Sequence, residues 1–217
     1  MVAVGASVAC WLLLTDTTEV VRGPRQSGSF NHLWLVIVFA FVVFLQGGVE
    51  NTAVTWIPSY ILRFAGSGVV LAAASSSLYW FGFMAARGFS SLLLLRAAPA
   101  RVLRGAVSVA LVASVLLVVV PSVGGRNVAI FMLGAALAPI YPLLIAELFA
   151  RSRHTSDSRW VLATAAFGGS VLPWLAGWIS ARSGSLRMGI LTMPAALLLI
   201  ACILLALGRW RLVAAEK

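Results

Sequence analysis

The sequence predicts an all-α integral membrane protein, a bundle of six transmembrane helices preceded by a partial helix. Of the 217 residues, 61% are hydrophobic and only 10% are charged, and the mean hydropathy is +1.02. An ordinary soluble domain is about 45–50% apolar and about 25% charged. The composition therefore excludes a soluble enzyme, a disordered tail and a nucleic-acid-binding module.

Six apolar runs, separated by polar or basic residues, are each long enough to cross a bilayer. A hydrocarbon core about 30 Å thick requires roughly 20 residues of helix. The runs occupy residues 33–62, 69–95, 102–120, 128–150, 160–181 and 186–207. The connections at 63–68, 121–127 and 182–185 are short, so we expect antiparallel neighbours in a compact bundle.

The start of the chain departs from this pattern. Residues 2–14 are apolar, but a helix of that length reaches only about 20 Å, which is short for a span. No basic residue precedes the run, as a signal peptide would require. We expect a partial helix and linker at 1–32, a six-helix transmembrane unit at 33–208 and a tail at 209–217.

The basic residues predict the orientation of the helices. If the 22–29 linker is cytoplasmic, 12 Lys and Arg residues lie inside and 4 outside, namely Arg63, Arg126, Arg182 and Arg187. By the positive-inside rule, the linker and the C-terminus are cytoplasmic, in a bacterial inner or plasma membrane. The net charge of +10 thus reflects topology, and no nucleic-acid partner is expected.

Several short motifs follow one another along the spans. An aromatic and glycine-containing stretch at 79–88 leads into basic residues at 96–104, glycines and prolines mark 133–142 and 167–177, and 184–187 precedes the last span. In order and spacing these motifs resemble the C-terminal six-helix half of a major facilitator superfamily (MFS) transporter. The stretches 47–50 and 56–60 are most similar to fucose-permease-like sugar carriers.

This resemblance implies secondary transport of a small polar solute, a sugar or related metabolite, with proton symport as a further hypothesis. It implies no enzyme activity and no cofactor. MFS carriers hold the substrate between two six-helix halves, so the expected partners are the solute, the lipid bilayer and a missing or separate N-terminal half. One departure is that residues 82–104 lack the acidic residue usual in the family's loop signature. The alternative is a truncated, non-transporting half-carrier or a membrane interaction subunit.

Glu50 is the acidic residue that lies well inside a predicted span. A carboxylate at that depth costs about 2.5–3.5 kcal/mol, so it must face protein or water or be protonated. Gln46 is four residues earlier, on the same helical face, and Asn51 is adjacent. We expect a substrate or proton site here; the alternative is a structural carboxylate bonded to a neighbouring helix.

Four aromatic residues near the middle of the membrane are candidates for contacts with a sugar ring: Trp56, Tyr79, Tyr141 and Trp174. Aromatic faces with a few polar groups are typical of small-molecule sites. For each residue the alternative is packing or anchoring at the membrane interface.

Two further groups are candidates for conformational control. Glu147 resembles the acidic residue that pairs with loop arginines in sugar carriers, with Arg87 and Arg151 as possible partners; the alternative is a solvated ion pair worth about 0–1 kcal/mol. Pro139, Pro142 and Pro173 lie within predicted helices and would act as hinges, although any one of them could be a simple packing kink. The two cysteines and two histidines are scattered, so no metal site is expected.

Overall fold

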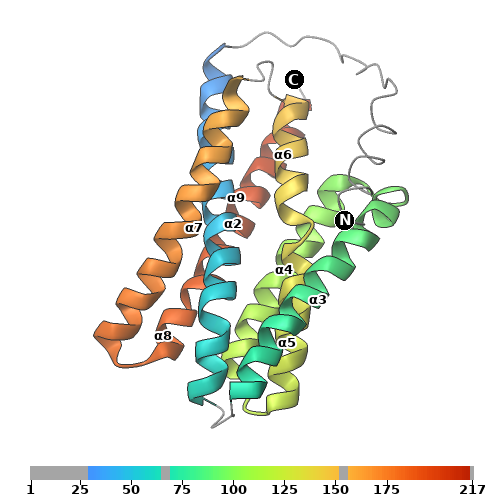
Figure 1. The fold of residues 1–217 in the computed structure, drawn as a ribbon. Helices are drawn as coiled ribbons and strands as arrows, with labels where there is room; N and C mark the ends of the chain where they lie inside the picture. The colour runs from blue at the N-terminus through green and yellow to red at the C-terminus, as the bar shows by residue number, and fades with distance from the viewer. Residues whose placement is uncertain (1–28, 65–68, 152–155, 216–217) are drawn as a thin grey trace, which may run out of the picture. The chain divides into compact units, whose positions relative to one another are not determined.

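The computed structural model of the protein describes residues 29–64, 69–151 and 156–215 (Figure 1). The predicted partial helix at 2–14 and most of the linker lie outside the described residues. Residues 31–217 form one compact unit. Its described helices are α2 (Ser29–Phe64), α3 (Val69–Leu94), α4 (Pro99–Val119), α5 (Val123–Leu137), α6 (Ile140–Arg151), α7 (Ser156–Ser183), α8 (Leu186–Ile190) and α9 (Thr192–Ala215).

The all-α membrane class is confirmed. Within the described residues, five stretches are long and apolar enough to cross a membrane: Trp34–Arg63, Pro99–Val119, Val123–Leu148, Val161–Ser183 and Leu186–Leu207. The sixth predicted span, α3, has 26 residues but is not among these five.

Two of the predicted spans are interrupted. The run expected at 128–150 is split into α5 and α6, and the run expected at 186–207 is split into α8 and α9. The connection expected at 121–127 is also shorter than predicted, because α5 begins at Val123. Ser122 caps this helix by accepting a hydrogen bond from the Gly125 N–H at 3.2 Å, which provides for one of the free N–H groups of its first turn.

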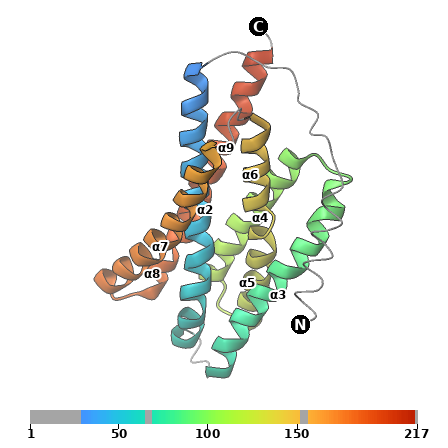
Figure 2. The same cartoon turned by 45° about the horizontal axis from the view of Figure 1, so that its top comes forward.

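α7 runs beside α2 in both views (Figures 1 and 2). The two helices approach so closely that a Cβ added at Gly168 would overlap the Phe44 carbonyl, and one added at Gly47 would lie 2.5 Å from the Ala165 carbonyl oxygen. The Thr164 hydroxyl also donates to the Ala40 carbonyl at 3.1 Å. Gly168 and Gly47 therefore allow the backbones of α2 and α7 to pack closely.

A second close crossing joins α3 to α5. A Cβ at Gly134 would overlap the Tyr79 carbonyl, and one at Gly82 would overlap the Phe131 carbonyl. The backbones of α3 and α5 are thus held together by reciprocal glycines. This contact fixes the Tyr79 side chain relative to α5.

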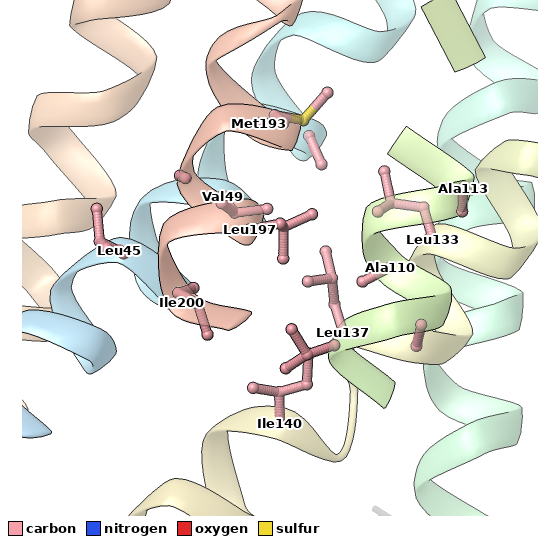
Figure 3. Close-up of a cluster of buried hydrophobic side chains, with 14 of the residues drawn as sticks. Leu45, Val49, Ala110, Ala113, Leu133, Leu137, Ile140, Met193, Leu197 and Ile200 are labelled. Carbon is pink, nitrogen blue, oxygen red and sulfur yellow. The ribbon is translucent and has the colours of Figure 1, made fainter. Parts of the chain in front are cut away.

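Five helices meet in the buried core drawn in Figure 3. Its labelled side chains come from α2 (Leu45, Val49), α4 (Ala110, Ala113), α5 (Leu133, Leu137), α6 (Ile140) and α9 (Met193, Leu197, Ile200). Leu137 and Ile140 flank the break between α5 and α6, so the break lies inside the protein. An irregular backbone at membrane depth requires such a location.

Candidate functional site

The Glu50 carboxylate is the centre of the candidate site. Glu50 lies in the second half of α2 and is half-buried. The Arg87 guanidinium of α3 attracts its charge, and the charge also acts on the hydroxyls of Tyr79 and Tyr141. Three other residues singled out in the sequence, from α3 and α6, thus lie within electrostatic range of Glu50 of α2.

Gln46 is completely buried, one turn before Glu50. Its amide nitrogen faces the end of α5, where it lies 3.5 Å from the Leu137 carbonyl oxygen. Its carbonyl oxygen Oε1 has no hydrogen-bond partner among the described residues. Gln46 therefore joins α2 to the break between α5 and α6, while its Oε1 atom accepts no hydrogen bond from the described residues.

Tyr79 carries a second polar atom of this kind. Its side chain is 2% exposed, and its ring packs against Trp80 and Phe83 at centroid distances of 5.6 Å and 6.1 Å. Its hydroxyl has no hydrogen-bond partner within the described part of the chain. Because buried polar groups are normally paired, the Gln46 oxygen and the Tyr79 hydroxyl call for a water or a polar solute.

Asn51 and Trp56 are used in the contact between α2 and α7. The Asn51 amide donates to the Gly47 carbonyl at 2.9 Å and lies against Gly169. The Trp56 indole N–H donates to the Pro173 carbonyl at 2.9 Å. By contrast, Trp174 is 66% exposed on the surface of α7. Asn51 and Trp56 thus take part in packing between helices, and Trp174 lies on the surface.

Arg87 lies inside α3 rather than at its end. Its guanidinium is 4.8 Å from the centre of the Phe83 ring, a cation–π contact that keeps it beside the helix. Glu147 is half-buried in α6. Arg151 is the last residue of α6, and its side chain lies outside the described part of the structure. The expected gating pair of Glu147 with an arginine stays a prediction.

The prolines mark where backbone hydrogen bonds are missing. Pro139 cannot donate to the Ala135 carbonyl, and Pro142 cannot donate to the Ala138 carbonyl. These losses coincide with the end of α5 and the beginning of α6. Pro173 lies within the continuous helix α7, where Trp56 bonds its carbonyl. The break thus occurs where two prolines act within one turn.

One buried residue was not predicted from the sequence. Arg126, expected in an outer connection, is only 3% exposed. Its Nε donates to the Val120 carbonyl at 2.8 Å, and its guanidinium lies 5.7 Å from the centre of the Tyr60 ring. The signal in the sequence was Ser122, whose capping position places Arg126 in the first turns of α5.

Comparison with known proteins identifies solved structures with a similar fold. No protein-family model and no curated protein sequence matches the chain. The solved structures that match include the E. coli fucose:proton symporter FucP, at a TM-score of 0.74, and an MFS transporter, FucP, in the outward conformation, at 0.73. Each of these two has 16% sequence identity to this chain, and the match covers 94% of this chain and 52% of the other. The chain therefore spans about half the length of the structures it matches, and its resemblance to half an MFS carrier is confirmed for the fold.

Proposed function

We propose that this chain takes part in secondary transport of a small polar solute as one half of an MFS-type carrier. The observation that carries the proposal is the group around Glu50, a carboxylate in an apolar bundle, within electrostatic range of Arg87, Tyr79 and Tyr141. Ionisable residues inside a membrane span are expensive and usually functional. Transporters of this kind bind their substrates near the middle of the bilayer.

A sugar or related metabolite is the proposed solute class. The Gln46 oxygen could accept a hydrogen bond from a solute hydroxyl, and the Tyr79 hydroxyl could donate one. The two solved structures named above are both of FucP, which in one of them is described as a fucose:proton symporter. This similarity supports both the sugar class and proton coupling as parts of the proposal, with Glu50 as the group that exchanges the proton.

The proposed carrier includes a second six-helix half. The fold match covers about half of each transporter, and MFS substrates are held between two halves. We place the carrier in a bacterial inner or plasma membrane, with the linker and the C-terminus in the cytoplasm, on the 12-to-4 distribution of basic residues.

Uptake of labelled sugars and organic acids into membrane vesicles containing the full chain tests this function. With an imposed proton gradient, we expect wild-type vesicles to accumulate one solute class above its outside concentration. Glu50→Gln should abolish this uphill uptake while preserving exchange of labelled for unlabelled solute across the membrane, since exchange needs no net proton movement. Glu50→Asp, which keeps the carboxylate, should retain part of the uphill uptake.

Each result has a distinct meaning. If Glu50→Gln still concentrates the solute normally, proton coupling through Glu50 is wrong, although transport stands. The wild-type chain is tested alone and together with a six-helix membrane protein encoded by a neighbouring gene. If neither preparation accumulates or exchanges any solute of the panel, transport itself is contradicted.

A further inference from the structure

An apolar cavity of about 930 Å³ lies between α3, α4 and α5. Its lining includes Phe89 and Leu93 of α3, Val102 and Val109 of α4, and Met132 of α5. Neither Glu50 nor Tyr141 lines it. The solute proposed above is polar, so this cavity needs an occupant of different chemistry.

Large apolar side chains of this cavity are open to the surroundings of the bundle. Phe89, Leu93 and Met132 are 68%, 52% and 40% exposed. In a membrane, such side chains face hydrocarbon rather than water. An acyl chain is therefore the occupant that the walls of the cavity favour.

Two arginines line one end of the cavity, where α3 ends and α4 begins. Arg96 and Arg101 both belong to the lining and flank a tight turn, in which the Arg96 N–H donates to the Leu93 carbonyl and the Arg101 N–H to the Ala98 carbonyl, at 3.1 Å and 2.8 Å. Residues 82–104 contain no acidic residue. Neither Glu50 nor Glu147, the carboxylates whose side chains are described, lines the cavity.

From this arrangement we propose that the cavity binds one anionic phospholipid, with an acyl chain between α3, α4 and α5 and the phosphate at Arg96 and Arg101. The charges are complementary, because two cations without a carboxylate in the cavity face the lipid phosphate. The depths also agree, because the arginines lie at the end of the helices, where headgroups lie, and the apolar walls extend inward from them. Basic pockets between transmembrane helices are known to bind anionic headgroups. The inference is independent of the transported solute.

The structure offers one variant with a matched control for the lipid headgroup and another for the acyl chain. Arg96→Gln with Arg101→Gln removes the two cations at the cavity. Arg63→Gln with Arg182→Gln removes the same charge from two arginines that do not line it. Gly105 lines the cavity, and a Cβ there would have nothing within 4 Å, so Gly105→Leu fills the space without disturbing the backbone. Gly124→Leu adds the same side chain in open space elsewhere.

The experiment measures the lipid that remains bound to the full chain. The protein is reconstituted into bilayers of equal parts phosphatidylglycerol and phosphatidylcholine with the same acyl chains, extracted into detergent, and its bound lipid is quantified by native mass spectrometry. We expect retention of phosphatidylglycerol over phosphatidylcholine. The Arg96/Arg101 double variant should lower this preference by roughly thirtyfold, since each of the two interfacial arginines contributes on the order of 1 kcal/mol. Gly105→Leu should abolish retention of both lipids, whereas both controls should behave as wild type.

Several outcomes would overturn the proposal. Equal retention of the two lipids by the wild type would show that the arginines do not select an anion. The same loss in the Arg63/Arg182 or Gly124 variants would show that the effect is not local to the cavity. Displacement of phosphatidylglycerol by millimolar inorganic phosphate or glycerol phosphate would indicate a headgroup site without an acyl chain. Unchanged retention by Gly105→Leu would likewise exclude the cavity as the binding place.

Discussion

Two buried polar atoms, Gln46 Oε1 and the Tyr79 hydroxyl, set the candidate site apart from ordinary helix packing. The Gln46 Oε1 atom and the Tyr79 hydroxyl have no hydrogen-bond partner within the described residues. An unpaired buried polar group costs about 1–3 kcal/mol. A hydrogen bond to either atom from a polar solute or water would offset that cost.

Tyr79→Phe tests whether the hydroxyl serves the solute or the fold. The ring contacts with Trp80 and Phe83 remain, and no described hydrogen bond is lost. We expect an unchanged or slightly higher apparent Tm in detergent and a reduced affinity for the transported solute, measured as a raised KM for uptake. Tyr79→Leu is the comparison, because it also removes ring packing and should lower the Tm. A normal KM in Tyr79→Phe would remove this hydroxyl from the site.

The sequence was informative at the residue scale wherever the chemistry of a residue contradicted its surroundings. Glu50 could be identified because a carboxylate inside an apolar run is unfavourable wherever it points. Trp56 and Arg126 could not be assigned in this way. The Trp56 bond depends on the neighbouring α7 carbonyl, and the burial of Arg126 depends on where α5 begins. A single sequence specifies neither of these neighbours.

At the scale of helices, glycines determine how closely α2 approaches α7. Gly168→Ala places a Cβ against the Phe44 carbonyl, so the helices must separate. We expect a destabilisation of about 1–3 kcal/mol, as for other overpacked positions, measured as a lower apparent Tm by circular dichroism. Gly105→Ala is the control, since a Cβ there meets nothing within 4 Å. It should be neutral or stabilise by up to about 1 kcal/mol through helix propensity. Equal effects at the two positions would contradict the close crossing.

The break between α5 and α6 leads to a prediction about rate. Pro139→Ala with Pro142→Ala restores the two N–H donors that the Ala135 and Ala138 carbonyls lack. If the break is a hinge, the joined helix should exchange its amide hydrogens more slowly over 135–142, and the uptake rate should fall without loss of the folded protein. An unchanged uptake rate in a variant with slower exchange would make the break a packing feature only.

Element boundaries show what apolar length can and cannot predict. The runs located six helical segments because about 20 apolar residues match the bilayer. They did not locate the split at Ala138, because apolar residues continue across it. Boundaries of this kind depend on single prolines and caps, whereas the spans depend on many residues together.

For the molecule as a whole, the order of the motifs predicted the half-MFS fold that the comparisons confirm. No single motif was specific. Their order along the chain was informative because each glycine must lie where a neighbouring helix crosses closely. Gly134 does so against α3, and Gly168 does so against α2. The chain spans about half the length of the structures named above, so the surface that a proposed second half would contact is predicted from the exposure of its helices.

α7 presents the surface that a second half is expected to cover. Only 17% of the Val161–Ser183 window is buried, against 61% for Val123–Leu148. Phe167, Trp174 and Trp178 are exposed at spacings of seven and four residues, which places them along one side of the helix. A photoreactive amino acid at Trp174 should therefore cross-link to a polypeptide in native membranes, whereas the same group at Leu198, exposed on α9, should cross-link to lipid. Mass spectrometry of the adduct then identifies a separate bundle of apolar helices or a second copy of this chain. Lipid adducts alone at both positions would contradict a carrier built from two halves across this surface.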